Sequence, residues 1–515
     1  MRVGFYIPAF EHLGISYLSA VLEQAGHETV GFMDPLLCKE GAFHTKSLER
    51  LLDMESYVVD QIVNSDVDLL AFSVVTNNFI HACRVARSVK AQRDIPTVFG
   101  GIHCSSVPHR VVEKPEIDYV VVGEGEGAMV DLAGHLDAGE TKAEIPNIWL
   151  KDGDRVVSSA PRHVIEDLDS LPFPNKDVFY AAAPSFLQRH YMTTASRGCC
   201  FACSYCNNSR MRRVYEGKGR WRRRRSVDNL MAELLQAQEK YSFTDIRFWD
   251  EVFIDDRDWL EEFAEKYPPA IGKPFFCWGH ARFIDEDVVA TLEKAGCQEL
   301  NIGVEAVQEE TRRELLRRTD TTDEIIEAFD LVRPTRMWLS TGNIVALPGQ
   351  TVEDVAEMAA FYNEHRVDRT WVFFFRYYPN TAIVDLALEQ GYLTPEDAEN
   401  LEDPPERAVS ISRSNKSDNQ DMVRLATVIY LTSLLPKGLV ARILKNDRWR
   451  WIPAFNLQPF IAIAAAFLKR IRFGKRPTVE GYSTSRYVQA MIQYGARKAA
   501  WKLRRRFRGS PRRDA

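Results

Sequence analysis

The first 145 residues or so carry short apolar runs that alternate with amphipathic stretches. The amphipathic stretches, 14–25 and 79–90, have the periodicity of helices. The apolar runs are rich in Val, Ile and Phe, which is typical of buried parallel strands. We therefore predict a doubly wound, Rossmann-like α/β domain, which binds ligands beyond the carboxyl ends of its strands. The predicted strands are Val3–Ile7, Thr29–Phe32, Asp68–Val74, Thr97–Phe99 and Tyr119–Val122.

A second alternating series runs from His190 to about residue 400. Helical stretches such as Val227–Tyr241 and Glu286–Ala295 separate six strand-like runs, so the pattern predicts six βα units with functional groups at the carboxyl ends of the strands. The predicted strands are Met192–Ser196, Asp245–Trp249, Phe275–Gly279, Glu299–Val304, Trp338–Ala346 and Thr370–Arg376. The prolines between the two series predict a linker, and they are Pro146, Pro161, Pro172, Pro174 and Pro184.

Three cysteines stand on one short loop at the start of the second series. Cys199, Cys203 and Cys206 have a C-x3-C-x2-C spacing. A [4Fe–4S] cube has four irons, so three thiolates leave one iron open to an outside ligand. Cys200 permits a second register, C-x2-C-x2-C, although the longer gap is preferred. A zinc site and inert buried thiols are the alternatives.

The cysteine loop and its flanks resemble the radical S-adenosylmethionine (SAM) superfamily. The preceding run 194–198 predicts a strand that ends in a glycine turn, and the aromatic Tyr205 before the last cysteine is usual in that family. The resemblance implies a partial (β/α)6 barrel, a cluster whose open iron binds SAM, and release of a 5′-deoxyadenosyl radical. It also implies an external electron donor such as flavodoxin or ferredoxin.

Several strand ends of the second series are similar to the SAM-binding motifs of that family. The resemblance implies that carboxylates after the second strand meet the ammonium group of SAM, that the fourth strand reaches the ribose, and that the fifth passes the adenine. An arginine after the third strand is expected to meet the SAM carboxylate. Each motif alone is weak, because such groups usually form turns and caps. The residues expected to contact SAM are Tyr205, Asp250, Glu251, Arg282, Glu305, Gly342 and Pro348.

The loops of the first series, especially the GGxH and GEGE runs, look like those of the cobalamin-binding domain that precedes the radical SAM core in a large subfamily. No Asp-x-His-x-x-Gly motif is present, so the resemblance implies cobalamin without a histidine on cobalt. His103 is expected either to contact the cofactor or to be a helix-cap or surface residue. A response-regulator-like or empty nucleotide fold is the alternative for this domain. The expected cobalamin contacts are Leu13, Gly14, Thr76, Asn77, Gly100, Gly101, His103, Gly123 and Glu124.

The charge of the last segment differs from that of the rest of the chain. Residues 441–515 hold 19 Lys and Arg against 3 Asp and Glu, a net charge of +16, whereas the whole chain carries −6. The apolar stretch 451–468 contains Pro453 and Pro459, so it is a poor transmembrane span but suits the interface of an anionic membrane. RNA is the competing partner. A solvated cap with disordered arginines is the third alternative.

These patterns together predict an α/β enzyme of several parts. They are a cobalamin-binding domain at 1–145, a linker at 146–185, a radical SAM domain at 186–400 and a basic, mainly helical region at 401–515. The odd total of nine cysteines, which are scattered outside the 199–206 cluster, and the absence of a secretory start predict a cytoplasmic protein, with peripheral attachment to the inner membrane surface as an open alternative. The expected reaction is methyl transfer to an unactivated carbon of a hydrophobic or natural-product substrate. Radical ring formation or rearrangement, as in cyclases of the subfamily, and a cobalamin or redox sensor are the alternatives.

Overall fold

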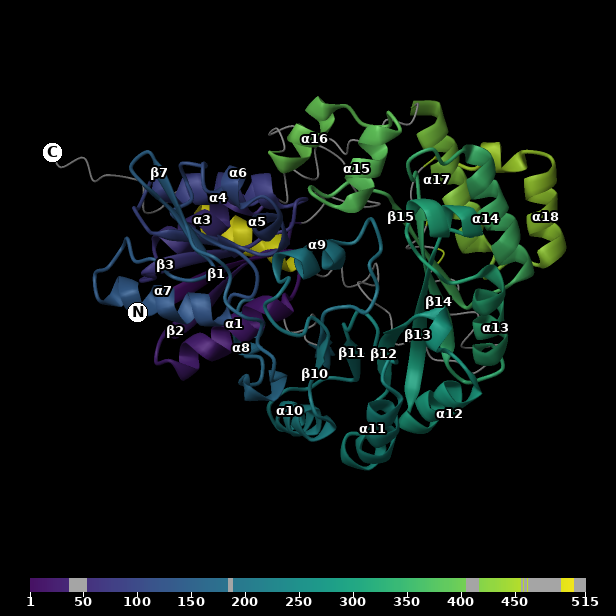
Figure 1. Cartoon of the computed structure of the whole chain (residues 1–515), viewed down its shortest axis with the longest axis horizontal. Helices are drawn as coiled ribbons and strands as arrows, with labels where there is room; N and C mark the ends of the chain where they lie inside the picture. Colours follow the sequence, from purple (N-terminus) through teal and green to yellow (C-terminus); the bar gives the residue numbers. More distant parts are fainter. Residues whose placement is uncertain are drawn as a thin grey trace. The chain divides into compact units, whose positions relative to one another are not determined.

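The computed structural model describes residues 1–36, 53–183, 189–403, 416–454, 457, 461 and 492–503. The chain divides into two compact units (Figure 1). The first unit consists of Met1–Arg162, Pro172–Leu187 and Tyr482–Ala515, and the second of His163–Leu171 and Gln188–Gly481.

The first unit is built on a seven-stranded sheet in the order β2-β1-β3-β4-β5-β6-β7. Strands β1 to β5 are parallel, as the apolar runs predict, and β6 and β7 add an antiparallel pair at one edge. The strand order reverses between β1 and β3, which is where doubly wound folds bind their ligands. The strands are β1 Arg2–Pro8, β2 Glu28–Asp34, β3 Leu69–Ser73, β4 Thr97–Gly100, β5 Tyr119–Val121, β6 Ile148–Asp152 and β7 Arg155–Ser158.

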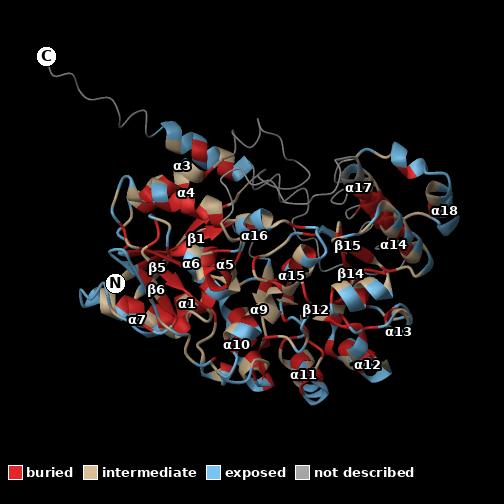
Figure 2. Ribbon diagram, turned by 45° about the horizontal axis from the view of Figure 1, so that its top comes forward, coloured by how far each residue is buried: buried red, intermediate tan, exposed pale blue. Residues whose placement is uncertain are grey.

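Helices cover both faces of this sheet. Helix α1 packs on α7, and α3 packs on α4. Figure 2 shows the first pair on one side of the mostly buried strands and the second pair on the other. The helices are α1 Leu13–Gln24, α3 Glu55–Val63, α4 Phe79–Lys90, α5 Ile102–Ser106, α6 Pro108–Val111, α7 Glu126–Asp137 and α8 Asp177–Tyr180. The predicted doubly wound domain is therefore confirmed.

The proline-rich stretch 146–185 contains structure that the sequence interpretation did not anticipate. Strands β6 and β7 form a hairpin whose turn passes through Gly153 at φ +60°. Pro146 and Pro161 flank this hairpin rather than interrupt it, and Ile148 and Leu150 of β6 are buried in the first unit. Prolines are tolerated beside an edge strand because they remove no hydrogen bond from the ladder there.

The second unit is built on a six-stranded, wholly parallel sheet in the order β15-β14-β13-β12-β11-β8, which confirms the six predicted βα units. Its strands are β8 His190–Thr193, β11 Asp245–Phe248, β12 Phe275–Gly279, β13 Cys297–Glu305, β14 Trp338–Val345 and β15 Arg369–Phe374. Its helices include α9 Asn207–Val214, α10 Val227–Lys240, α11 Arg257–Ala270, α12 Glu286–Ala295, α13 Thr322–Val332, α14 Val352–Glu364, α15 Ala382–Glu389 and α16 Pro395–Glu402.

Alternation along β13 separates the two faces of this sheet. Leu300 and Ile302 belong to the large apolar core that packs against the helices. The opposite face carries Glu299, Asn301 and the position of Gly303, because successive residues of a strand face opposite sides. Polar groups on that second face make it the candidate site.

Helices α17 Lys416–Leu431 and α18 Lys437–Lys445 complete the described part of the second unit, and both pack on α14. The basic helical segment 492–503 instead belongs to the first unit. There Tyr494 is buried, and the Trp501 indole donates to Asp60 Oδ2 over 2.8 Å. Within the described residues, no helix is long and apolar enough to cross a membrane. Most of the apolar stretch 451–468 lies outside the described residues.

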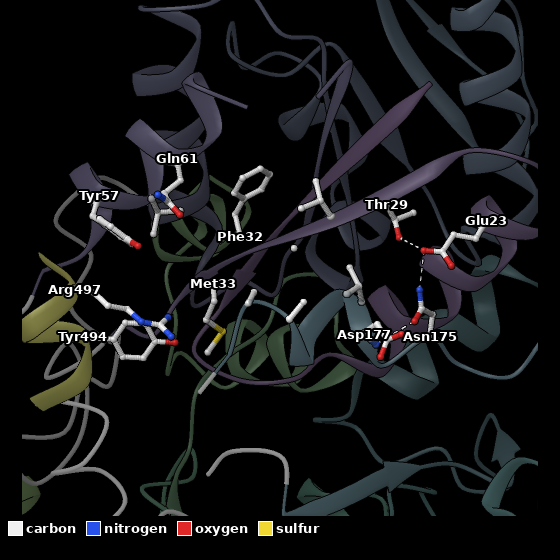
Figure 3. Close-up of a pocket in the computed structure, with 16 residues that line it drawn as sticks. Glu23, Thr29, Phe32, Met33, Tyr57, Gln61, Asn175, Asp177, Tyr494 and Arg497 are labelled. Carbon is white, nitrogen blue, oxygen red and sulfur yellow. Dashed lines mark hydrogen bonds between the residues drawn. The ribbon is translucent and has the colours of Figure 1, made fainter. Parts of the chain in front are cut away.

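Segment 492–503 also closes a cavity of about 420 Å³ along the outer edge of β2 (Figure 3). Glu23, Thr29 and Asn175 meet at one end, where Asn175 donates to Glu23 Oε1 over 2.8 Å. Tyr494 and Arg497 lie at the other end, with the guanidinium of Arg497 5.3 Å from the ring of Tyr494.

Candidate functional site

A short two-stranded ribbon fixes the start of the cysteine loop. Strand β9, Ser196–Arg197, pairs antiparallel with β10, Arg223–Arg224. Gly198 follows at φ +81°, and a Cβ there would lie 2.3 Å from the carbonyl oxygen of Trp221. Only glycine fits this turn, so the ribbon and the glycine together set the direction in which the loop leaves the sheet.

The three expected ligands are free thiols on this loop. Cys199, Cys203 and Cys206 are half-buried, whereas Cys200 is exposed. The hydrogen bond between the neighbouring thiols lowers the pKa of Cys199 to about 7 and raises that of Cys200. The Phe201 N–H also points at Cys199 Sγ over 3.5 Å. At Cys199 the low pKa favours the thiolate, which is the form that binds metals, whereas burial raises the pKa of Cys203 to about 11 and that of Cys206 to about 12.

Ser204 anchors the middle of the loop. It is buried, its N–H donates to Leu316 O over 3.0 Å, and its hydroxyl donates to Leu315 O over 2.5 Å. Its own carbonyl accepts from the N–H of Ile383 over 3.0 Å. The Ser209 hydroxyl lies 3.0 Å from Cys203 O and 2.7 Å from Cys206 O. The loop is thus tied to chain segments more than a hundred residues downstream.

The donor set fits a [4Fe–4S] cluster. In a cube each thiolate binds a different iron, so the sulfurs need not converge on one point. Among the residues that the structure describes, no three Cys, His, Asp or Glu side chains converge as a single-ion site would require. Three free, half-buried thiols on a loop with fixed ends supply what the open-iron arrangement needs.

Asp250 holds the strand end that leads into the loop. It is buried, its carboxylate accepts from the N–H of Ala195 at 3.0 and 3.1 Å, and the Ser196 hydroxyl also donates to it. Burial raises its pKa. Its neighbour Glu251 is exposed and accepts from Asn208 Nδ2 over 2.9 Å in the first turn of α9.

Glu305 ends β13 in a strained conformation, with φ +65° and a bulge in the pairing with β14. Such strain persists only where the surroundings enforce it, and it clusters at functional sites. Its carboxylate is hydrogen-bonded to Tyr205 and lies 3.9 Å from the guanidinium of Arg318. Arg318 also pairs with Asp320 over 3.1 Å and donates to Gly303 O over 2.7 Å. Burial raises the pKa of Glu305, and Arg318 opposes that shift.

Gly342 leaves open space on this face of the sheet, whereas the carboxylate of Glu305 occupies the space above Gly303. Gly303 and Gly342 face each other across β13 and β14, and a Cβ on Gly342 would have no atom closer than 3.9 Å. Two residue pairs before them, Asn301 is 1% exposed, and neither amide atom has a hydrogen-bond partner in the described part of the chain. A buried unpaired amide costs free energy unless a ligand or water satisfies it. The open space at Gly342 and the unpaired amide of Asn301 therefore fit a polar ligand such as SAM.

Two other expected SAM contacts, Arg282 and Pro348, lie in the turns that follow β12 and β14. Arg282 follows β12 in a 3-10 turn, Ala281–Phe283, where it donates to Thr319 Oγ1 over 2.8 Å and lies 3.6 Å from Glu324. Pro348 stands in the turn after β14, and its neighbour Leu347 packs in the same apolar cluster as Tyr205. The fifth-strand motif and the aromatic residue of the cysteine loop therefore come together.

The sequence interpretation missed Arg318, Asp320 and His280. The His280 ring stacks on Phe201 at 4.0 Å between centroids, and burial followed by the charge of Arg318 lowers its pKa to about 3. The signal available was a charged pair, Arg318 and Asp320, two residues apart just before the start of α13. That signal is ordinary in turns and caps.

The loop after β1 lies at the switch point of the first unit. Ala9 adopts φ +66°, and the rings of Phe10 and His12 stack at 5.3 Å. Glu11 accepts from Lys176 Nζ over 2.6 Å, and both side chains are buried. Burial raises the pKa of Glu11, and Lys176 opposes that shift. This ion pair pins the loop to a segment more than 160 residues away.

Helix α1 starts directly after that loop with Leu13 and Gly14. A Cβ on Gly14 would meet no atom within 4 Å, so the first turn of the helix faces open space. Asn77 is exposed in the turn after β3, and Glu124 is half-buried after β5. These positions leave room for a bulky ligand at the carboxyl edge of the sheet.

His103 is not a surface residue, which corrects that part of the sequence interpretation. It is fully buried in α5, its ring packs on Phe79 at 4.3 Å, and its Nδ1 lies 3.1 Å from the hydroxyl of Thr76. The preceding turn passes through Gly100 and Gly101, and it directs the chain so that the His103 ring lies inside the unit. The histidine thus links the loops after β3 and β4.

Two glycines shape the carboxyl edge of this sheet. Gly101 adopts φ +100°, and a Cβ there would lie 2.6 Å from Val74 O. Gly123 adopts φ +86°, and its N–H donates to the Ser105 hydroxyl over 2.9 Å. Both positions favour glycine, because other residues rarely adopt such conformations, and at Gly101 the backbone of Val74 also approaches closely. The resulting glycine-lined edge fits a large cofactor.

Two family models match the chain, one in each unit. Residues 193–362 match the Radical SAM superfamily, and residues 9–133 match the B12 binding domain. The chain is a radical SAM enzyme with a cobalamin-binding domain. The two domains imply a [4Fe–4S] cluster, SAM and cobalamin as its cofactors.

Relatives of the enzyme include different activities. It is 24% identical over 336 residues to an uncharacterized methyltransferase of Pyrococcus horikoshii, covering 64% of this chain and 71% of that one. It is 26% identical over 369 residues to the anaerobic magnesium-protoporphyrin IX monomethyl ester cyclase of Cereibacter sphaeroides, covering 69% of this chain and 56% of the cyclase. A solved structure of the cobalamin-dependent SAM radical enzyme OxsB, with aqua-cobalamin and SAM bound, shares the fold with a TM-score of 0.64. It is 15% identical, over 98% of this chain and 81% of that one.

Proposed function

We propose that the enzyme transfers a methyl group to an unactivated carbon of a hydrophobic or natural-product small molecule. The observation that carries the proposal is the three-thiol loop at the carboxyl edge of a parallel sheet, in one chain with a glycine-lined cobalamin-binding fold. The methyltransferase relative supports it. When bound, the cluster and SAM supply a radical that removes hydrogen from carbon, and cobalamin supplies the methyl group.

The chain's own residues hold and orient these groups. Cys199, Cys203 and Cys206 would ligate three irons, while Asp250 and the β9–β10 ribbon fix the loop that carries them. Arg318 keeps the carboxylate of Glu305 oriented, because the buried charge needs a partner. Positioning of this kind lowers the entropic cost of bringing the reacting groups together.

The remaining contacts are part of the same proposal. SAM contacts are supported by the open space at Gly342 and by the unpaired amide of Asn301. We assign SAM binding to Tyr205, Asp250, Glu251, Arg282, Glu305, Gly342 and Pro348. We assign cobalamin binding to Leu13, Gly14, Thr76, Asn77, Gly100, Gly101, His103, Gly123 and Glu124. We retain 1–145, 146–185, 186–400 and 401–515 as the functional segments.

Ring formation or rearrangement without methyl transfer is the second candidate. The cyclase relative favours it, since it is as similar to the enzyme as the methyltransferase is. Both reactions would use the same radical chemistry, so the fate of the SAM methyl group distinguishes them.

Labelled metabolites test the two candidates and identify the substrate. Cells with and without the gene are grown on trideuteromethyl methionine, and their lipids, pigments and other small molecules are compared by mass spectrometry. We expect a product that requires the gene and carries the intact trideuteromethyl group. A gene-dependent product without label would favour ring formation, and the absence of any gene-dependent product in both labelled and unlabelled extracts would contradict both.

We also propose that the enzyme works in the cytoplasm and that its basic C-terminal region attaches it to an anionic membrane surface. The support is the charge of +16 over residues 441–515, together with Trp451, which is 90% exposed beside Arg450. Part of the region has another task, because Tyr494 and Trp501 pack within the first unit.

Because of that packing, the membrane proposal is tested without removing segment 492–503. A chain that ends at Leu503 loses six arginines, and Trp451→Ala removes the exposed indole. Each cation near the surface is worth about 1 kcal/mol and is screened by salt. We expect the shortened chain to float less with anionic liposomes at low salt. Trp451→Ala should reduce the liposome binding that remains at high salt. Equal flotation of both variants and the full chain would refute the proposal.

A further inference from the structure

An arginine-rich segment follows the cysteine loop directly. Residues 210–225 contain nine Lys and Arg and one acidic residue, Glu216. The segment comprises most of helix α9, the turn after it and strand β10. The repulsion among so many like charges destabilises the folded chain unless neighbouring acids neutralise them or an acidic partner binds them.

Acidic neighbours neutralise the last part of the segment. Arg222 and Arg224 both bind the carboxylate of Asp255. Arg225 binds Glu233, and both of these side chains are buried. These arginines therefore contribute to the structure of the second unit.

The first part of the segment is different. Arg212, Arg213 and Arg220 are exposed, and Lys218 is half-exposed. Within the described ranges none of the four side chains pairs with a carboxylate, although the backbone N–H of Arg220 donates to Glu166 Oε1 over 3.2 Å. The guanidinium of Arg213 donates to the carbonyl of Asn380 over 3.0 Å. Burial and the charge of Arg213 lower the pKa of Arg210, which shows that the cations are crowded. We call Arg212, Arg213, Lys218 and Arg220 the basic patch.

The basic patch lies close to the cluster ligands. Helix α9 has Cys206 as its N-cap residue and runs over eight residues to Val214. At about 1.5 Å per residue, Arg212 and Arg213 lie about 10 Å along the axis from that cysteine. A protein seated on the patch would place its own redox centre near the cluster.

We propose that the basic patch is the docking surface for an acidic one-electron carrier protein. The inference rests on the proposed function, since radical chemistry at the cluster requires one electron from outside. The reduced carrier loses one electron, the bound cluster gains it, and no bond or proton is transferred. The chain as a whole carries −6, so an acidic carrier is repelled except where local cations attract it. Complementary charge of this kind raises the association rate and fixes the orientation of the carrier.

The test uses the full-length, cluster-loaded enzyme and an acidic bacterial flavodoxin. The patch variant is Arg212→Glu with Arg220→Glu, because neither guanidinium has a structural partner within the described residues. The matched control is Lys294→Glu with Arg336→Glu, which reverses two exposed cations of the second unit. Binding of flavodoxin is measured by surface plasmon resonance at low and high salt. Formation of 5′-deoxyadenosine is measured with either reduced flavodoxin or titanium(III) citrate as the reductant.

At low salt we expect the patch variant to bind flavodoxin at least about tenfold more weakly than the wild type, and high salt to remove most of this difference. Its flavodoxin-driven rate should fall similarly, while its titanium-driven rate stays within about twofold. The control should behave as the wild type. Unchanged binding by the patch variant would overturn the inference, as would an equal loss with both reductants. If titanium yields no 5′-deoxyadenosine even in the wild type, the proposed function fails instead, and the binding measurement still decides the docking surface.

Discussion

Replacing any one of Cys199, Cys203 and Cys206 by alanine is expected to abolish 5′-deoxyadenosine formation by the anaerobically reconstituted enzyme. Each thiolate supplies the only protein ligand to one iron, so two thiolates cannot hold a cube with a single open iron. Iron and sulfide content should fall along with activity. The measurement is product formation from SAM by liquid chromatography, together with iron analysis of the purified variants.

Cys200→Ala is the matched control, because it removes a thiol from the same loop. The variant should keep the cluster and the activity, although the Cys199 thiol loses the hydrogen bond that lowers its pKa. A dead Cys200 variant combined with an active Cys199 variant would show that the cluster uses the shorter C-x2-C-x2-C register.

Lys176→Met is expected to destabilise the first unit by about 3–5 kcal/mol at neutral pH, because it leaves the buried carboxylate of Glu11 without its partner. The loop after β1 should then open, since the ion pair is what pins it. Hydrogen exchange at the amides of β1 and α1 in the full chain measures the effect. Weaker cobalamin binding should accompany faster exchange.

The pH dependence of this variant provides its internal check. Burial already raises the pKa of Glu11, and removing Lys176 removes the effect that opposes this shift. A raised pKa in the folded state means that the folded state binds the proton more tightly, so the loss of stability should shrink as the pH falls below that pKa and grow as the pH rises through it. The double variant Lys176→Met with Glu11→Leu should recover much of the loss. Equal destabilisation of the single and double variants at all pH values would contradict this account.

The parallel strands of both sheets could be predicted because their signal is local. Runs such as 69–73 and 119–121 are mostly apolar, as suits strands buried on both faces. Hairpin β6–β7 could not, because only Ile148 and Leu150 face the core while β7 is mostly exposed. An edge hairpin with one buried row gives a weak pattern, and the flanking prolines obscured it further.

The candidate site also contains residues that the sequence reveals and residues that it does not. The cysteine spacing and the glycines at positions 101 and 123 are visible in the sequence, because one short segment carries each of them. Lys176 is not, since it acquires its role from Glu11, a carboxylate that is distant in the sequence. Arg318 is not either, because its contact with Glu305 depends on how the chain turns after β13. The same holds for Asp250, whose bonds to Ala195 and Ser196 show that it supports the loop. Such partners are set by topology, and residue type alone does not reveal them.

The products of SAM test the central claim most directly. The purified enzyme is reconstituted with iron, sulfide and cobalamin, reduced, and supplied with SAM and the gene-dependent substrate identified from the labelled extracts. A cobalamin-dependent radical methyl transfer consumes SAM in two ways, so we expect S-adenosylhomocysteine and 5′-deoxyadenosine to form together, each in proportion to methylated product. 5′-Deoxyadenosine without S-adenosylhomocysteine would contradict methyl transfer, and the absence of both from an enzyme with a full complement of iron and corrin would contradict the account as a whole.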